Sequence, residues 1–218
     1  MTPSPQAHPL TQASSERELG GKAANLAHLA ANGFPVPRFA TVPVSTFRAF
    51  MREAALHDPI RALLGELDFS RPDAVKTASR TIHGLITSQA LPAGLREAIL
   101  HEAARFGDAF VAVRSSALGE DGSKDSYAGQ MDSFLFVKGP DAILDAVRAC
   151  WASAFSERAL SYRRMKGADV LAIDIAVVIQ EMVSPDVSGV MFTANPLTGD
   201  RDSLVINGTY GAGEGIVS

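Results

Sequence analysis

The spacing of apolar residues predicts a helical first half of the chain. Apolar side chains recur at helical intervals over 22–32, where Asn32-Gly33 supplies a stop signal. Residues 34–37 should be extended, because each of their two prolines disfavours helical geometry at the residue before it. Further helices are predicted over three ranges, the last two with a proline suited to a helix start: 45–56, 72–89 and 92–105.

The pattern changes after Gly107. An apolar run at 110–113 is typical of a buried strand, and a polar, glycine-containing loop is expected to follow it over 115–129. A long amphipathic helix is predicted over 141–166. Short apolar runs between turn signals predict the remaining strands: 131–137, 175–183, 188–193 and 204–207. The predicted fold class is α/β (α+β), a helical N-terminal part followed by a mixed sheet with a long helix.

Length and composition are those of an ordinary soluble protein, with 218 residues, 46% of them hydrophobic, and a mean hydropathy of +0.08. This length supports one large domain or two small subdomains with a buried core. We expect a flexible lead-in over 1–18, a mainly helical subdomain over 19–108 and an α/β subdomain over 109–218.

Charge and cysteine content exclude several classes of protein. A net charge of −4 argues against a broad nucleic-acid-binding surface, which needs clustered lysine and arginine. No stretch approaches the roughly 18 uninterrupted apolar residues that a membrane helix needs. Cys150 is the only cysteine, so no intramolecular disulfide can form, and its surroundings suggest a buried helical position. We therefore expect a cytoplasmic protein that binds neither nucleic acid nor membrane.

Two basic residues are candidates for contact with phosphate. Lys22 follows Gly20-Gly21 at the start of the first predicted helix, where its ammonium and nearby N–H groups can meet a phosphate together. Arg114 stands where a buried strand ends, and its planar guanidinium can donate two parallel hydrogen bonds. Each has a plainer interpretation: a solvated lysine after a loop, and an arginine bonded to loop carbonyls or to Glu120 or Asp121.

Two further segments have compositions that suit a nucleotide. Residues 126–130 are small and flexible enough to fold over a polyphosphate, although a hairpin turn would have the same composition. Gln180 and Glu181 interrupt an apolar strand, where backbone polar groups can become free to bind an adenine edge. An ordinary edge strand would show the same interruption.

Six short motifs stand in an order and spacing that resemble the dikinase family. They are 20–26 (GGKAANL), 33–37 (GFPVP), 113–117 (VRSSA), 120–121 (ED), 128–130 (AGQ) and 189–193 (GVMFT). From about Leu19 to the last residue, the chain resembles the N-terminal ATP-binding domain of that family, also called the PEP/pyruvate-binding or pyruvate phosphate dikinase (PPDK-type) domain. Phosphoenolpyruvate synthase and rifampin phosphotransferase are members.

The resemblance implies an ATP-grasp-like fold with nucleotide in a cleft between two lobes. It implies an ATP-dependent phosphotransferase that moves the β-phosphoryl of ATP onto a histidine of another domain and releases AMP and phosphate. Lys22 and Arg114 would contact the phosphates, under a flap of Gly129, Gln130 and Ser133. The resemblance also implies that the adenine is held by Gln180, Glu181, Met182 and Val183. Glu214 would either approach the ribose or cap a glycine turn.

Two parts of the family pattern are absent from the sequence. The family's metal-binding residues lie downstream of the segment that ends here at 211–218, so the resemblance predicts an incomplete cleft, with Mg²⁺ ligands outside this chain. The acceptor histidine is also absent: Thr81-Ile82-His83-Gly84 lacks the glycine-rich lead and is helix-periodic, so His83 is interpreted as an ordinary helical residue. A phosphohistidine domain or partner chain would supply both. The alternatives are a non-catalytic nucleotide-binding or interaction module, and a piece that folds without binding nucleotide.

Overall fold

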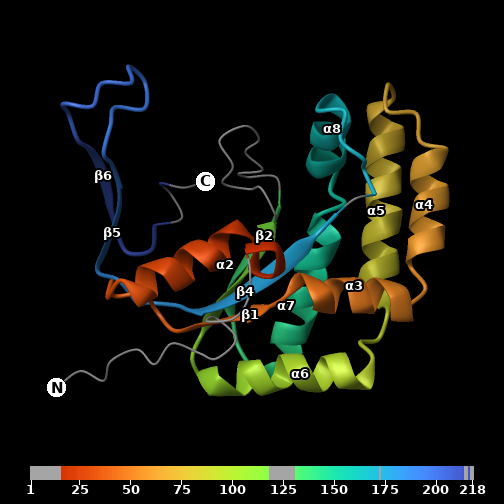
Figure 1. Cartoon of the computed structure of the whole chain (residues 1–218), viewed down its shortest axis with the longest axis horizontal. Coiled ribbons are helices and arrows are strands. Elements are labelled where there is room, and N and C mark those ends of the chain that lie inside the picture. The colour runs from red at the N-terminus through yellow and green to blue at the C-terminus, as the bar shows by residue number, and fades with distance from the viewer. Residues whose placement is uncertain (1–15, 118–130, 172, 214–215, 217–218) are drawn as a thin grey trace. The chain divides into compact units, whose positions relative to one another are not determined.

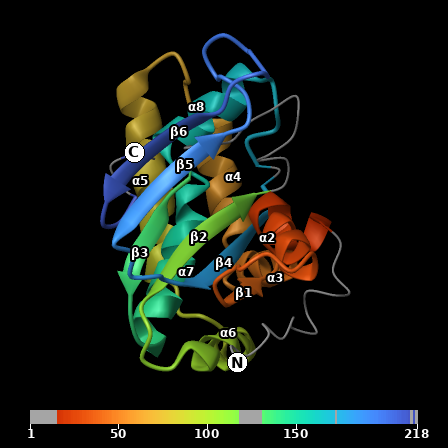
Figure 2. The same cartoon turned by 90° about the vertical axis from the view of Figure 1, so that its left-hand side faces the viewer.

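A four-stranded antiparallel sheet forms the centre of the larger of two compact units, Met1–Met182 and Val183–Ser218. The structure is a computed structural model, which describes residues 16–117, 131–171, 173–213 and 216. The strands of this sheet lie in the order β1-β4-β2-β3, side by side in Figure 2. Their bounds are Phe39–Val42 for β1, Val111–Ala117 for β2, Ser133–Val137 for β3 and Ile175–Glu181 for β4.

Every strand pairing among the described residues is antiparallel, so the expectation of a mixed sheet is wrong for this part of the chain. The reason lies in the position of β4. It is inserted between β1 and β2 and runs antiparallel to both of them (Figure 1). β1 and β2 run in the same direction, but β4 lies between them, so they do not form a parallel pair.

Helices account for most of the remaining larger unit. Their bounds are Glu16–Ala31 (α2), Val44–Glu53 (α3), His57–Gly65 (α4), Pro72–Ser88 (α5), Ala93–Ala103 (α6), Pro140–Ser153 (α7) and Glu157–Met165 (α8), with a 3₁₀ turn η1 at Ala104–Phe106. The predicted helices at 72–89 and 92–105 are confirmed within a few residues. The pattern missed α4 and β1, which have only nine and four residues. Residues 16–18, assigned to a flexible lead-in, already belong to α2; residues 1–15 lie outside the described chain.

The two faces of the sheet are covered by different helices because adjacent strand residues point to opposite faces. Val113 and Val177 pack in the main core with α7, where Trp151 stacks on Phe50 of α3 at a centroid distance of 5.0 Å. Val178 points the other way and packs on α2. The core contains residues from both sides of position 108, and the subdomain boundary expected there stays a prediction.

The long helix predicted over 141–166 is wrong, because two helices replace it. Ser156 has extended backbone angles (φ −60°, ψ 156°), and its Oγ accepts a hydrogen bond from the Ala159 N–H at 3.2 Å, which starts α8. The buried Arg163 donates to the carbonyl of Ala154 at the end of α7. The helix is therefore interrupted here, because Ser156 caps the start of α8 and Arg163 bonds to a carbonyl at the end of α7. The apolar period nevertheless continues across the interruption.

The loop expected from Ser115 onward is also wrong at its start. Residues 115–117 continue β2, where Ser115, Ser116 and Ala117 pair with Val177, Ala176 and Ile175 of β4. Both serines are almost completely buried. Their polar side chains suggested a loop, but hydrogen bonds within the fold satisfy them: the Ser115 hydroxyl donates to the Asp132 carbonyl and the Ser116 hydroxyl to the Leu19 carbonyl.

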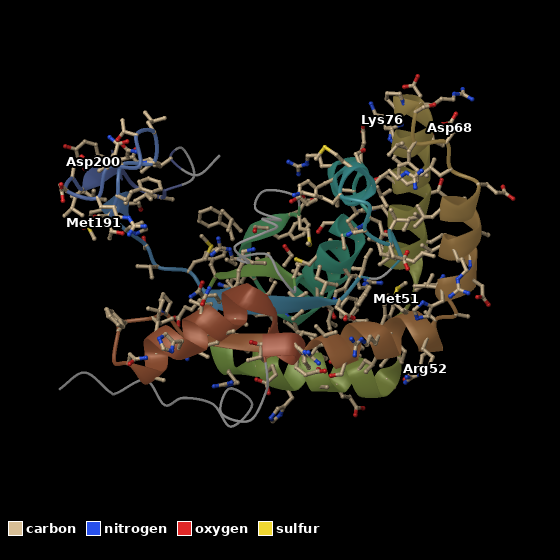
Figure 3. The ribbon with its side chains drawn as sticks, turned by 45° about the horizontal axis from the view of Figure 1, so that its top comes forward. Met51, Arg52, Asp68, Lys76, Met191 and Asp200 are labelled. Atoms are coloured by element: carbon tan, nitrogen blue, oxygen red, sulfur yellow. The ribbon has the colours of Figure 1, made fainter. Side chains whose placement is uncertain are left out.

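The smaller unit contains a β-hairpin of β5 (Val187–Phe192) and β6 (Val205–Tyr210), which confirms two predicted strands, the second extended by three residues. Asn195 organises the connection between them. Its backbone N–H donates to the Asp200 carbonyl at 2.7 Å, and its side-chain Oδ1 accepts from the Leu197 N–H at 2.9 Å. Met191 and Asp200 are labelled on this unit in Figure 3.

We expect Ala55→Gly to stabilise the protein. Ala55 follows α3 with φ +51°, a left-handed conformation that favours glycine. The Ala55 N–H donates to the Arg52 carbonyl, and the Leu56 N–H donates to the Met51 carbonyl. These are the paired bonds of a Schellman cap. Met51 and Arg52 are labelled in Figure 3. Thermal or urea unfolding should show a gain of about 0.5–1 kcal/mol.

The matched control for this substitution is Ala62→Gly. Ala62 is equally exposed but lies inside α4, where glycine should cost about 0.5–1 kcal/mol. The two substitutions should therefore have opposite signs. A loss of stability in both variants would contradict the assigned strain at Ala55.

Candidate functional site

The strand register places three of the predicted site residues on one face of the sheet. Arg114 pairs with Val178 on one side and with Ser133 on the other, and residues paired across antiparallel strands share a face. Gln180 lies two residues beyond Val178 on β4 and therefore shares that face as well. Because Val178 packs on α2, we call this surface the α2 face.

The α2 helix, which carries Lys22, is fastened to the end of β2 through Ser116. The hydroxyl of Ser116 donates to the Leu19 carbonyl at 2.9 Å and accepts from the Ala23 N–H at 3.2 Å. Lys22 lies between these two anchor points on the chain. Ser116 itself is two residues from Arg114 on the same strand and the same face. The fold thereby places the helix segment that carries Lys22 on the sheet face that carries Arg114.

Gly20 permits this close approach. Its backbone angles, φ 71° and ψ 169°, interrupt the helix and lie in a region open almost only to glycine. A Cβ atom at this position would stand 2.1 Å from the backbone oxygen of Ser116. Gly20, the first of the glycine pair singled out in the sequence, therefore has a packing role, which the sequence could not specify.

Arg114 has an unsatisfied donor. Its side chain is half-buried, and its Nε is buried with no hydrogen-bond partner among the residues that the structure describes. A buried N–H without an acceptor is costly, so such an atom is a natural position for an acceptor oxygen from a ligand. The alternative partners, Glu120 and Asp121, lie outside the described residues.

Burial and nearby charges act together on the thiol of Cys150. Burial raises the pKa of the Cys150 thiol far above its usual range, the negative charge of Asp132 raises it further, and the positive charge of Lys22 opposes both. The prediction that Cys150 is a buried helical residue is confirmed, and its raised pKa is the reverse of what a reactive thiol needs.

The end of β4 is held on both sides by backbone hydrogen bonds. The Glu181 N–H donates to the Arg38 carbonyl at 2.8 Å, and the Met182 N–H donates to the Phe110 carbonyl at 2.9 Å. The Glu181 side chain is ion-paired with Arg38, with 2.6 Å between Oε2 and Nε. Val183, the last residue of the predicted adenine segment, is the first residue of the smaller unit.

The remaining predicted residues cannot be placed. Gly129, Gln130 and Glu214 lie outside the described residues, so their roles, like those of the placed residues, stay predictions. Sequence reasoning missed Ser116 and Arg38. A serine inside an apolar strand was the available signal for the first, while nothing local marks Arg38 as the partner of a residue 143 positions away.

The described part of the chain also contains a pocket away from these residues. This small pocket of about 30 Å³ is lined by none of the predicted site residues; its walls are Phe47, Met51, His57, Ile60, Phe155, Leu171 and Ile173. Among the described residues, no three His, Cys, Asp or Glu side chains gather as metal ligands would. Nor does any described helix have the length and apolar character needed to cross a membrane.

In this α/β protein, the helix that bears Lys22 lies on the sheet face that carries Arg114, whose Nε has no partner among the described residues. Comparison with known proteins gives the family. The chain matches the pyruvate phosphate dikinase, AMP/ATP-binding domain over residues 16–218, and it belongs to this family.

Three relatives illustrate the range of proteins that share this domain. The chain is 39% identical over 206 residues to the phosphoenolpyruvate synthase of Aeropyrum pernix, covering 91% of this chain and 25% of the relative. It is 43% identical over 203 residues to the prodigiosin synthesizing transferase of Serratia marcescens, covering 92% and 21%. It is 41% identical over 205 residues to the rifampicin phosphotransferase of Streptomyces sviceus, covering 92% and 23%. The chain thus spans about a quarter or less of each of these relatives.

Proposed function

We propose that this chain is the ATP-binding portion of a dikinase-type phosphotransferase. Its family is an AMP/ATP-binding domain, and two of the relatives are named as a synthase of phosphoenolpyruvate and a phosphotransferase. The observation that carries the proposal is the buried Nε of Arg114, which has no partner among the described residues and lies on the same sheet face as the helix that bears Lys22. A phosphate oxygen would supply the missing acceptor and would be attracted by both positive charges.

Each candidate residue has a role in this proposal. Lys22 and Arg114 contact the phosphates, Ser133 joins Gly129 and Gln130 in a flap over them, and Gln180 to Val183 hold the adenine. Glu214 approaches the ribose. Phosphoryl transfer depends mainly on positioning the phosphates and neutralising their spread charge, which is work that fixed lysine and arginine side chains can do.

The reaction needs parts that the described residues do not contain. We propose that the β-phosphoryl of ATP passes to a histidine on another domain or chain, with release of AMP and phosphate, and that an ATP-grasp-like cleft is completed around the nucleotide. No three potential metal ligands gather among the described residues. We propose that the ligands for Mg²⁺ lie outside this chain.

The test measures AMP formation from ATP. Chromatographic separation of ATP, ADP and AMP monitors the reaction. The chain by itself should form AMP at least about two to three decades more slowly than the chain joined to the remainder of a relative such as the phosphoenolpyruvate synthase, because loss of one electrostatic stabiliser already costs that much. Rapid AMP formation by the chain alone would show that the catalytic residues are misplaced. Continued inactivity of the completed protein would favour a non-catalytic nucleotide-binding module.

A further inference from the structure

Arg38 joins three segments of the chain at the end of β4. Its Nε donates to the Glu181 carboxylate at 2.6 Å, and its backbone carbonyl accepts the Glu181 N–H at 2.8 Å. Its Nη1 donates to the carbonyl of Arg105, in η1, at 3.0 Å. Side chain and backbone of one residue thus hold Glu181 at the same time, which fixes both the position and the orientation of this strand end.

The Arg38–Glu181 pair acts from the face opposite to the candidate site. Glu181 pairs with Val111, a residue of the main core, so its side chain leaves the sheet on the face that α7 covers. Its neighbour Gln180 lies on the α2 face with Arg114. The carboxylate is therefore held away from the surface on which the phosphates of a nucleotide are proposed to lie.

The other side of the same segment is fixed independently. The Phe136 N–H donates to the Sδ of Met182 at 3.0 Å, and the Phe136 ring meets the Phe110 ring edge-on at a centroid distance of 6.2 Å. Met182 is also bonded to Phe110 through its backbone N–H. On the β1 side, however, Arg38 provides the only side-chain attachment of Glu181 among the described contacts.

The charges of this pair favour its formation at neutral pH. The hydrogen bond and positive charge of Arg38 hold the pKa of the Glu181 carboxyl below its ordinary value, despite some burial. Without the Arg38 side chain, the Glu181 carboxylate would be an unpaired negative charge next to the segment proposed to hold the adenine. The end of β4 would then keep its backbone hydrogen bond to residue 38 but lose the side-chain link through Arg38 to η1.

We propose that Arg38 is a positioning residue for nucleotide binding: it holds the end of β4 in place for the nucleoside part of ATP and keeps the Glu181 carboxylate on the opposite face. This inference rests on the proposed function. Arg38 does not touch the nucleotide; it acts through Glu181 and the backbone of the segment that follows it.

The test compares three variants of the complete chain, Arg38→Ala, Arg38→Lys and Arg48→Ala, by calorimetric titration with AMP and with ATP. Arg38→Ala should weaken both ligands by a similar factor of roughly ten, because the loss lies at the nucleoside end that they share. Arg38→Lys should restore part of the affinity, since lysine keeps the charge but cannot donate in two directions from a planar fork.

Arg48→Ala is the matched control. Arg48 is bonded to Asp174 just before β4, with Nε–Oδ1 at 2.8 Å and Nη2–Oδ2 at 2.5 Å. The side-chain exposures of this pair, 55% and 31%, match the 59% and 28% of Arg38 and Glu181. The two pairs therefore hold opposite ends of one strand, and Arg48→Ala should leave both affinities within about twofold while changing the thermal midpoint to a similar extent.

Several outcomes would overturn the inference. Unchanged AMP and ATP affinity in Arg38→Ala would do so, as would an equal loss in Arg48→Ala, which would indicate a general effect on stability. A loss confined to ATP would assign Arg38 to the phosphates instead. If the unmodified chain bound neither ligand, the proposed function would fail, and this inference would fail with it.

Discussion

Replacing Arg114 by alanine is expected to weaken ATP binding by about one to two decades, because a charge-assisted hydrogen bond to phosphate contributes about 1.5–3 kcal/mol. The same substitution should not lower the midpoint of thermal unfolding. The Nε of Arg114 is buried without a partner among the described residues, so its removal relieves an unsatisfied donor. Calorimetric titration with ATP and thermal unfolding of the same samples would show the two effects together.

Lys22→Ala should weaken ATP binding to a similar extent, since Lys22 is the second proposed phosphate contact. His83→Ala is the control: His83 is exposed on α5 and belongs to none of the segments that form the α2 face. It should bind ATP as the unmodified chain does. Equal affinity in all three variants would contradict the proposed site. A loss of ATP binding only in His83→Ala would indicate that His83, and not Lys22 or Arg114, takes part in binding.

Gly20→Ala is expected to have the largest effect on stability, with a loss of about 3 kcal/mol or more. Two costs add at this position: a backbone conformation that alanine scarcely adopts, and a Cβ placed 2.1 Å from the Ser116 oxygen. The start of α2 would have to leave the sheet, which would also displace Lys22. We therefore expect lower stability in urea unfolding and weaker ATP binding in the same variant.

Gly33→Ala separates the two costs. Gly33 also has a positive φ, +79°, but a Cβ there would meet nothing within 4 Å. Its substitution should cost only about 1–2 kcal/mol and should leave ATP binding unchanged. If both glycine variants lost the same stability, the close approach to Ser116 would not be the reason for glycine at position 20.

Local pattern was sufficient where one segment decides its own structure. The helices at 72–88 and 93–103 follow from apolar period and proline position, and the burial of Cys150 follows from its place on an amphipathic helix. The same pattern failed at 154–156, because a helix break made by Ser156 and Arg163 leaves the apolar period intact. It also failed for β1, whose four residues are a strand only because β4 pairs with them.

The amino-acid sequence by itself determined the family, the two candidate phosphate-binding residues and the segments that carry them, because these depend on residue identity and order. Only the tertiary structure decided which of these residues share a surface. The insertion of β4 between β1 and β2 joins distant segments of the chain. The hydrogen bond between Ala23 and Ser116 joins residues 93 positions apart, and the Arg38–Glu181 pair joins residues 143 positions apart. Such contacts arise from packing and register across the whole sheet, and no short window of sequence contains both partners.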